Sequence, residues 1–496
     1  MVETQPRTSV DIAGIRRPDG SLDAATALEA YEGSLDARLA AHLLRRAGFG
    51  GTPDEITRYA SMSAGDAAES LVRFPSTSSL PAPSDVYDPT SIFQQYGARG
   101  LRDMADDARR QLLKQVRRDE VLSVLSLQLW WLNRMLATPA PLQEKMAFFF
   151  HSHFTTAAVQ KGVSPTMVFN QNQLFRTYAL GNLRELTRAV SIDPAMLLYL
   201  DNASNVASHP NENYARELME LFTLGVDHYT EDDVRESARA WTGWRVIRLT
   251  GQAYYDARLH DDGTKVFLGN RGNWTGDDIV NIIFSQAQCS RFFASALLSE
   301  FVYDNPEPEL VDGVANLLLR HDFDLAPVVS AILRSNVFYS DRAYRARVKT
   351  PVELVVGTYK ALGVTQIDRS ALPALRAMGQ ILFYPPNVAG WPGGENWLTS
   401  QMMIARQNFL AGLVNAQVMG ASSWLNDVPM DPAQATHSLV TTLLQDDASP
   451  ASYAQIKAYL AGDGTSALAM LGVENFQERI HGAAYLTMAM PAYQLA

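Results

Sequence analysis

The stretch 211–244 restricts the fold of this chain more than any other part of the sequence, because it contains two helices whose ends are both marked. Asn211 stands where a helix N-cap is expected, and Gly225 stands where a left-handed residue ends a helix. Thr230, with an acidic residue three positions later, forms a variant capping box for the second helix, which Gly243 ends. The stretch therefore predicts a helical hairpin.

The rest of the sequence repeats this pattern. Segments with capping residues at their starts and apolar residues at helical spacing recur from Leu35 to the end of the chain. Alternation of apolar and polar residues between Gly, Asp and Asn turns occurs only at about residues 245–270. The sequence therefore predicts a mainly α fold, with an irregular N-terminal arm at 1–33 and one large multi-helical domain at 34–496 that carries a short β-hairpin insertion.

Charge and cysteine content exclude several classes of partner. The net charge is -11 and no Lys/Arg-rich run balances it, which argues against a nucleic acid or an anionic membrane as partner. A single cysteine, Cys289, excludes an intramolecular disulfide and a multi-cysteine metal site. No apolar run reaches the roughly 18 residues that a membrane span needs, and the first residues lack the apolar core of a signal peptide. The sequence is thus consistent with a cytoplasmic protein, or with an exported protein whose leader it does not include.

Polar side chains of the first predicted helix form two rows at four-residue spacing. Glu212, Arg216 and Glu220 make one row, and Asn213 with Glu217 makes the other. Such rows are usually solvated helix faces that contribute a few tenths of a kcal/mol per pair. A solvated face is therefore the first interpretation, and a functional site is the alternative.

The alternative depends on the residues just before the hairpin, where an apolar run ends in Asp201 and Asn202, so that acids and carboxamides converge. Glu212 lies at a helix N-terminus that stabilises its anion, which suits it to act as a base or ligand, and a more buried Glu217 suits the role of acid. The candidate catalytic residues are Asp201, Glu212 and Glu217, and the candidate substrate-binding residues of this region are Asn202, Asn211, Asn213 and Arg216.

Two histidines, His151 and His153, end another helical segment and are the candidate metal ligands. Side chains two residues apart point about 200° apart on a helix, so this pair can hold one metal ion only if the chain has left helical geometry there. The cofactor that the pair would imply is a divalent metal. A structural role for both imidazoles is the alternative.

A loop at 384–399 is dense in Pro, Gly and Asn and carries Trp391 and Trp397. Rings on such a shaped loop either stack on sugars or fill the space between helices. Trp241 and Trp244 of the hairpin are further candidate stacking surfaces. Because an exposed loop of this kind would leave a large apolar patch, we expect Trp391 and Trp397 within about 25 Å of the 211–220 helix.

Several passages together resemble a bacterial family catalogued as domain of unknown function 1800. They are HLLRRAGFG, KMAFFFHSHFTT, DPAMLLYLDN, the whole 211–244 hairpin, HDDGTKVFLG, VKTPVELVVG and FYPPNVAGWPGGENW. They run in order from about residue 38 to the C-terminus, and one departs from the family: its Phe-Trp-His start is here Phe149-Phe150-His151. The resemblance implies a mostly helical, usually exported bacterial protein, often encoded beside a partner with a sulfatase-like fold. It implies no established activity.

Motifs of the common enzyme classes are missing: the sequence has no nucleophile elbow, P-loop, dinucleotide fingerprint, HExxH or CxxC array. Two hypotheses remain. In the first, the protein is an exported hydrolase-like enzyme that acts on a glycan or envelope polymer through the carboxylates of region 201–220, with metal assistance as a variant. In the second, it is a non-catalytic helical scaffold or maturation partner of a sulfatase-like-fold protein. Catalytic carboxylates should lie about 5–10 Å apart in an open cleft, whereas structural carboxylates should be sealed and paired.

Overall fold

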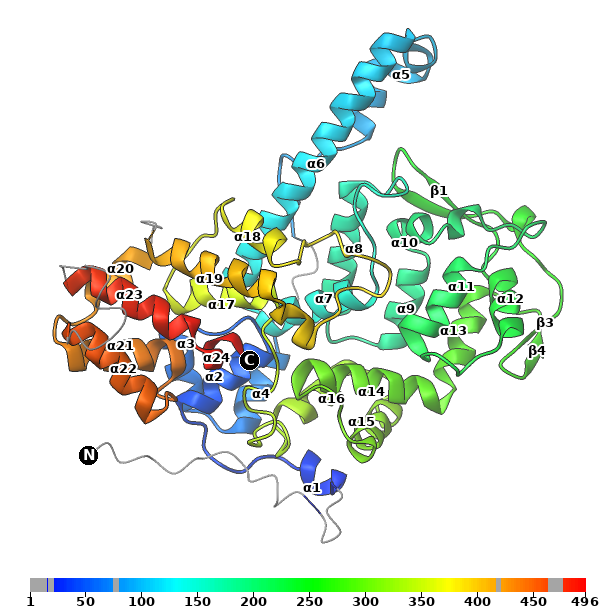
Figure 1. Cartoon of the computed structure of the whole chain (residues 1–496). Coiled ribbons are helices and arrows are strands. Elements are labelled where there is room, and N and C mark those ends of the chain that lie inside the picture. Colours follow the sequence, from blue (N-terminus) through cyan, green and yellow to red (C-terminus); the bar gives the residue numbers. More distant parts are fainter. Residues whose placement is uncertain (1–15, 17–21, 75–79, 416–420, 463–475) are drawn as a thin grey trace.

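The computed structural model describes residues 16, 22–74, 80–415, 421–462 and 476–496 of the chain. Most of these residues lie in helices, and the described strands form two antiparallel two-stranded sheets (Figure 1). The predicted mainly α fold is therefore confirmed. In the part of the chain that the structure describes, no helix combines the length and the apolar character that crossing a bilayer requires.

The N-terminal part contains six helices. They are α1 (Ala24–Leu28), α2 (Ala37–Arg46), α3 (Pro53–Ala60), α4 (Ala64–Val72), α5 (Thr90–Arg102) and α6 (Asp106–Ala137). Helix α5 and the first half of α6 stand out from the body as a pair (Figure 1), which we call the projection (residues 90–122). None of its residues is buried, so it has no core of its own.

The predicted irregular arm at 1–33 is partly regular. Residues 1–15 and 17–21 lie outside the described residues, but α1 forms where the Asp23 side chain accepts a hydrogen bond from the Ala25 N–H. The segment packs on the body, since the Val337 N–H donates to the Ala27 carbonyl at 2.9 Å. The prediction of a wholly irregular arm is wrong here, because one capped turn was enough to start a helix.

The middle of the chain forms a second group of elements. They are α7 (Pro141–His153), α8 (Pro165–Thr177), α9 (Leu183–Ser191), α10 (Pro194–Tyr199), η2 (Asn202–Ser204), α11 (Asn213–Glu217), η3 (Leu218–Thr223), α12 (Glu231–Ala240), α13 (Gly276–Phe284), α14 (Ala287–Phe301), α15 (Pro308–Arg320) and α16 (Leu325–Leu333).

The helical hairpin forms as predicted at Gly225 and Thr230, but its other two ends are shifted and its first helix changes pitch. The predicted N-cap Asn211 is one residue too early, since Glu212 occupies that position while the Asn211 side chain accepts a hydrogen bond from the Asn213 N–H, and α12 ends at Ala240, before Gly243. Gly225 has a φ of 86°, and the Thr230 capping box begins α12. After α11, however, η3 is a π-helix, in which the Thr223 hydroxyl donates to the carbonyl five residues earlier. The extra residue in this turn displaces Glu220 from the predicted row with Glu212. Glu220 instead accepts a hydrogen bond from the Tyr229 hydroxyl at 2.6 Å.

The β insertion consists of two hairpins rather than the one predicted. Strands β1 (Trp244–Ile247) and β2 (Gln252–Tyr255) pair with Trp244 opposite Tyr255, and β3 (Lys265–Phe267) pairs with β4 (Asn270–Gly272). Between them, Asp256 caps the short helix η4 (Ala257–Leu259). Gly251 and Gly269 both adopt positive φ at the turns, so each hairpin closes on its own glycine.

The C-terminal part completes the fold with α17 (Pro351–Ala361), α18 (Ala371–Ala377), η5 (Gly394–Leu398), α19 (Ser400–Asn415), α20 (Ala421–Asp427), α21 (Pro432–Leu444), α22 (Pro450–Ala461), α23 (Phe476–Ala489) and α24 (Pro491–Gln494). Helices α21, α22 and α23 pack on one another, and α23 also contacts α19.

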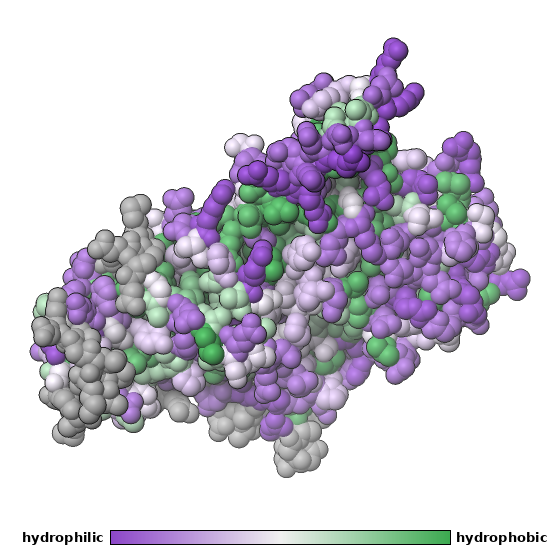
Figure 2. All heavy atoms as spheres, turned by 45° about the horizontal axis from the view of Figure 1, so that its top comes forward, coloured by the Kyte–Doolittle hydropathy of each residue, from purple (hydrophilic) through white to green (hydrophobic). Residues whose placement is uncertain are grey.

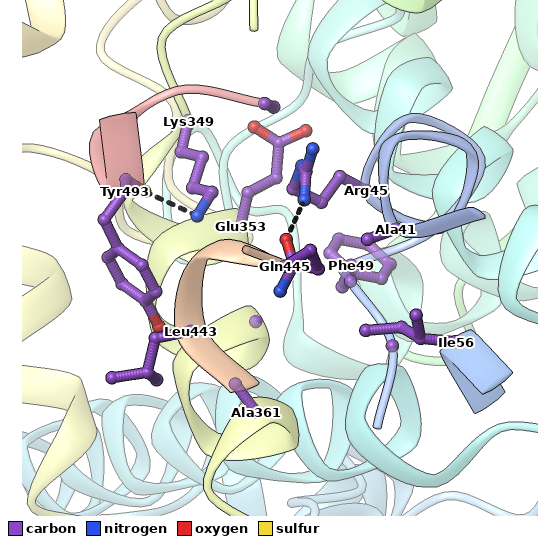
Figure 3. Close-up of a pocket in the computed structure, with 14 residues that line it drawn as sticks. Ala41, Arg45, Phe49, Ile56, Lys349, Glu353, Ala361, Leu443, Gln445 and Tyr493 are labelled. Atoms are coloured by element: carbon purple, nitrogen blue, oxygen red, sulfur yellow. Dashed lines mark hydrogen bonds between the residues drawn. The ribbon is translucent and has the colours of Figure 1, made fainter. Parts of the chain in front are cut away.

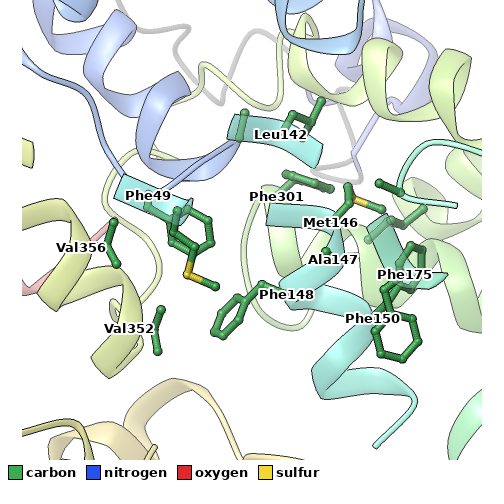
Figure 4. Close-up of a cluster of buried hydrophobic side chains, with 14 of the residues drawn as sticks. Phe49, Leu142, Met146, Ala147, Phe148, Phe150, Phe175, Phe301, Val352 and Val356 are labelled. Atoms are coloured by element: carbon green, nitrogen blue, oxygen red, sulfur yellow. The ribbon is translucent and has the colours of Figure 1, made fainter. Parts of the chain in front are cut away.

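Helix α7 lies at the centre of the buried core and presents apolar side chains on more than one side. Phe148 points toward Phe49, with ring centroids 5.7 Å apart, whereas Phe150 points toward Phe175 at 6.3 Å (Figure 4). A helix that is apolar around most of its circumference has to be covered on all those sides. Helices α4, α6 and α8 pack against α7.

The buried carboxylate of Glu144 joins α6, α7 and α8. It accepts hydrogen bonds from the Trp131 indole and the Arg134 guanidinium, both at 3.0 Å, and from two nitrogens of Arg176 at 2.8 Å. Burial alone would raise the pKa of Glu144, but the hydrogen bonds from Arg176, Arg134 and Trp131 outweigh it and hold the pKa below its ordinary value. Glu144 thus remains charged inside the core.

We predict that Glu144→Gln lowers the free energy of unfolding by about 3–5 kcal/mol, because it leaves the buried Arg176 cation without its counter-charge. Urea denaturation followed by circular dichroism measures the change. The matched control is Glu69→Gln, which removes a carboxylate in an exposed ion pair with Arg73 and should cost less than about 1 kcal/mol. Equal losses in the two variants would contradict the assigned role of Glu144.

Candidate functional site

A cleft of about 910 Å³ lies between the end of α7, the C-terminal half of α14, the segment 345–350 and the loop 391–398. Its volume is within the range of roughly 300–1,000 Å³ typical of ligand sites. Its polar lining residues are Ser152, His153, Ser299, Glu300, Asp304, Asn305, Arg345, Arg347, Thr350, Gln380, Glu395 and Asn396. We call it the central cleft.

The tryptophan loop forms one wall of the central cleft. A Cβ atom on Gly390 would lie 2.4 Å from the Ser152 carbonyl oxygen, so only glycine lets the loop approach the end of α7 this closely. Trp391 packs on His151 with ring centroids 5.5 Å apart and is 8% exposed, and Trp397 is 2% exposed. The two indoles therefore build the wall of the cleft and are not free-standing platforms.

Three carboxylates border the central cleft, and they differ in their partners. Glu300 pairs with Lys145 at 2.9 Å and with Arg347 at 3.1 Å, so its position is fixed from both sides. Asp304 and Glu395 form no hydrogen bond and no ion pair within 4.0 Å among the described residues, although the Asp304 charge helps to raise the pKa of Arg347. A Cβ atom on Gly394 would lie 3.4 Å from Asp304 Oδ2, so Asp304 lies against the residue that precedes Glu395. The cleft thus holds one carboxylate in direct ion pairs and two without a direct partner.

A buried ion network holds Glu300 in place. The Lys145 ammonium, which is completely buried, also pairs with Glu353 of α17. Burial by itself would raise the pKa of Glu353. The positive charges of Lys145 and Arg347 outweigh this effect and lower the pKa to about 2. Because Glu353 therefore stays ionised at neutral pH, it keeps Lys145 in position beside Glu300.

The two histidines do not form a metal site. Both lie in α7, which remains helical through His153, so the condition for shared coordination is not met. His151 Nε2 accepts a hydrogen bond from the Phe383 N–H at 3.0 Å, and His153 Nε2 donates to the Phe222 carbonyl at 2.9 Å. Among the described residues there is no group of three His, Cys, Asp or Glu side chains arranged to hold a metal ion. The imidazoles instead attach the tryptophan loop and the hairpin to α7.

The carboxamides before the hairpin form a network around Asn205, which the sequence analysis did not single out. The Asn205 amide donates to Asn202 Oδ1 at 3.0 Å, and its oxygen accepts from the Asn211 N–H at 2.9 Å. Asn213 donates to the Leu200 carbonyl at 3.2 Å. These contacts satisfy backbone and side-chain groups of the 201–213 loop. The carboxamides that were predicted to bind substrate thus bind one another and the backbone.

The predicted catalytic acids lie outside the central cleft. Asp201 adopts a left-handed conformation and pairs with Lys161 at 2.6 Å. Glu212 lies 3.4 Å from Arg216, whose closer partner is Glu231 at 2.7 Å. No residue of 201–220 lines the cleft. The structure therefore does not bring these acids into a common pocket with the tryptophan loop.

Glu217 differs from the other acids of the hairpin. It is half-buried, and no hydrogen bond or ion pair links its carboxylate to another described residue. Burial, with repulsion from Glu220, raises the pKa of Glu217 above its ordinary value. Its protonation would therefore be easier than that of an ordinary glutamate, which is the property that the acid role requires.

The two hairpin tryptophans differ in exposure, since Trp241 is buried and Trp244 is partly exposed. Trp241 is 1% exposed and packs edge-on against Tyr214 at 5.4 Å, so no face of its indole is open to solvent. Trp244 packs against Tyr255 across the β1–β2 hairpin at 5.5 Å. The space-filling alternative describes Trp241 better than the stacking hypothesis does.

Sequence reasoning missed the acids of α14 and the loop after it. Glu300 lies in the last turn of α14 and Asp304 follows this helix, and no local pattern distinguishes either of them from surface acids. Glu395 lies in the tryptophan loop, and its position beside Trp391 and Trp397 was the only available signal. Their meeting depends on contacts between segments that are distant in the sequence.

The fold and the cleft define a class: an α-helical protein with a polar, tryptophan-walled cleft at the end of its central helix. The family model described as "Protein of unknown function (DUF1800)" matches residues 42–495, and the chain belongs to this family. No curated protein and no solved structure matches the chain.

Acid should destabilise the protein through its buried histidines. Burial lowers the pKa of His151 to about 3 and that of His153 to about 4, against about 6.5 in the unfolded chain. Between pH 6.5 and 4 the unfolded state therefore binds more protons than the folded state, and stability falls as the pH falls.

We predict that His153→Gln, which keeps a donor for the Phe222 carbonyl, reduces the slope of unfolding free energy against pH by about 1.4 kcal/mol per pH unit in this window. Urea denaturation at a series of pH values measures the slope. The control is His437→Gln, at an exposed position, which should leave the slope almost unchanged. An unchanged slope in His153→Gln would show that His153 is not held neutral by burial.

Proposed function

We propose that the protein is a hydrolase-like enzyme that binds a glycan or a related envelope polymer in the central cleft. The observation that carries the proposal is the presence of two carboxylates without a direct partner, Asp304 and Glu395, beside the fixed Glu300 in one cleft of ligand size. Glycoside hydrolysis generally requires two carboxyl groups on either side of the scissile bond. The resemblance to a usually exported bacterial family supports an envelope substrate.

Asp304 and Glu395 are the residues proposed to transfer protons. One carboxylate takes a proton from the attacking water, and the other, in its acid form, gives a proton to the leaving glycosidic oxygen. Water forms the new bond to the sugar carbon while the bond to the leaving oxygen breaks. Glu300 is already bound by Lys145 and Arg347, so we assign it a positioning role.

The other lining groups suit recognition of a sugar. Asn305, Asn396 and Ser299 supply carboxamide and hydroxyl groups that pair with sugar hydroxyls. Trp391 supplies an apolar surface at the wall of the cleft. This mixture of a few polar groups with an aromatic wall is the usual composition of a small-ligand site.

We predict that Asp304→Asn and Glu395→Gln each lower the rate of glycan cleavage by about 10²–10⁴-fold, because each removes one proton-transfer group. Release of reducing ends from purified envelope glycans measures the rate, and thermal unfolding should show no loss of stability. Glu212→Gln is the matched control, since Glu212 lies outside the cleft, and it should retain activity.

Full activity in both cleft variants, or loss of activity in Glu212→Gln, would contradict a catalytic site in the central cleft and favour the acids of the hairpin. If the unmodified protein cleaves no envelope glycan, the hydrolase proposal fails.

A second function, as a non-catalytic scaffold or maturation partner of a sulfatase-like-fold protein, is favoured by the projection. Leu113 is 61% exposed and Val121 is 46% exposed, and they share one helix face with Arg110, Lys114 and Arg117. In the space-filling view the projection is mainly hydrophilic with hydrophobic side chains along its flank (Figure 2). An exposed face that mixes apolar and basic groups suits a partner with an acidic groove.

For this alternative we predict that Leu113→Asp with Val121→Asp leaves the unfolding free energy within about 0.5 kcal/mol of the original, because both positions are exposed. The same variant should lose retention on an immobilised sulfatase-like-fold protein from the same genome. The control is Ile404→Asp, which changes an equally exposed apolar residue far from the projection in sequence. If the Leu113→Asp/Val121→Asp variant and the Ile404→Asp control are retained equally on the immobilised partner, the projection has no docking role.

A further inference from the structure

A small cavity of about 40 Å³ lies where α2, α17, the end of α21 and the segment before the C-terminus meet. Arg45, Lys349, Glu353, Gln445 and Tyr493 line it, and it shares no lining residue with the central cleft. Figure 3 shows the side chains of Arg45, Lys349 and Glu353 directed toward the same space. The cavity therefore has a charged lining.

Cations exceed anions around this cavity. Arg45 and Lys349 line it, and Arg46 and Arg406 are buried nearby. None of these four cations has a carboxylate within 4.0 Å among the described residues. The nearest acid, Glu353, is already engaged: one oxygen pairs with a lysine of α7, and the other accepts a backbone N–H at 2.7 Å.

The second acid of the region is also committed. Asp447 pairs with Arg345 at 2.9 Å. Lys349 also lies over the Tyr493 ring, with its ammonium 4.1 Å from the ring centroid. Neither Glu353 nor Asp447 forms an ion pair with Arg45 or Lys349, so the two cations that line the cavity have no carboxylate in direct contact among the described residues.

The donors at the cavity are incompletely satisfied. Arg45 donates from one nitrogen to Gln445 at 2.9 Å and lies beside Tyr344, with its guanidinium 6.0 Å from the ring centroid, but its Nε and its other terminal nitrogen are buried without a well-formed hydrogen bond among the described residues. The Lys349 ammonium, on a residue that is 9% exposed, has three N–H groups and donates to the Tyr493 carbonyl at 2.5 Å. Buried donors and buried charges without partners are costly, so a group that accepts from both cations would stabilise the fold.

We propose that this cavity binds one small monovalent inorganic anion, of halide size, between Arg45 and Lys349. The cavity volume of about 40 Å³ exceeds the roughly 10–15 Å³ that a site needs in order to hold one water molecule, so an ion of about that size fits. The apolar side chains of Phe49 and Leu443 complete the lining, and apolar walls lower the local dielectric constant, which strengthens the attraction. The anion joins α2 and α17 to the end of α21 and has a structural role.

Burial, with repulsion from Arg45 and Arg345, lowers the pKa of Lys349 well below its ordinary value. A bound anion opposes this shift, because it favours the charged ammonium. Halide binding and protonation of Lys349 should therefore support each other.

The first test is thermal unfolding in sodium chloride, bromide or gluconate at constant ionic strength. Chloride and bromide should raise the Tm by roughly 1 °C for each tenfold increase above the Kd, while gluconate, which is too large for the cavity, should not. Equal Tm values in halide and gluconate would overturn the proposal. A response to sulfate without a response to halide would overturn the assigned size.

The second test is direct and needs no variant. Crystals grown in sodium bromide should show an anomalous bromine peak between the Arg45 guanidinium and the Lys349 ammonium. A cavity occupied only by water in these crystals would overturn the proposal.

The third test uses Lys349→Met, which removes one cation and keeps the apolar stem. The halide-dependent rise in Tm should disappear, and the Tm in gluconate should equal or exceed that of the unmodified protein, because an unpaired buried cation has been removed. Arg99→Gln, at an exposed position, is the control and should keep the halide response. A halide response in Lys349→Met equal to that of the control would contradict the site, and if this variant does not fold, the first two tests decide.

Discussion

The buried ion network of Lys145 is the interaction on which both cavities of the protein depend. Its ammonium is completely buried and pairs with Glu300 of α14 and with Glu353 of α17. Glu300 borders the central cleft and Glu353 borders the small cavity, so one cation positions an acid at each site. Loss of either acid would leave a buried charge unpaired, which is costly, and the three helices are therefore held in one relative arrangement.

Polar residues along α7 also hold other segments in place, as Lys145 does. Glu144 joins three helices through charged hydrogen bonds, and His151 and His153 each use one ring nitrogen to hold a backbone group of a distant segment. Burial keeps both imidazoles neutral. Side chains that suggest chemistry in the sequence thus serve here to satisfy buried backbone groups in a helical core, where every polar atom needs a partner.

The carboxylates of this molecule differ in whether they form a direct ion pair. Glu212 and Asp201 have cationic partners on the surface, and Glu144 and Glu353 have them in the core. Asp304 and Glu395 form no ion pair within 4.0 Å among the described residues, although the Asp304 charge acts on Arg347 from farther away, and both border a cleft large enough for a ligand. A free acid in a cleft can exchange a proton with a substrate, whereas a paired acid is held in its ionised state.

The sequence by itself determined the mainly α fold and the two inner ends of the hairpin helices, because capping and helical periodicity are local: Thr230 begins a helix and Gly225 ends one without help from distant residues. It also identified the tryptophan loop that walls the cleft. Only the tertiary structure decided that η3 is a π-helix, that the insertion has two hairpins, and that Asp304 and Glu395 rather than the hairpin acids line the central cleft. Which acids meet, and which are desolvated or paired, depends on how distant helices pack, and no local pattern in the sequence records that.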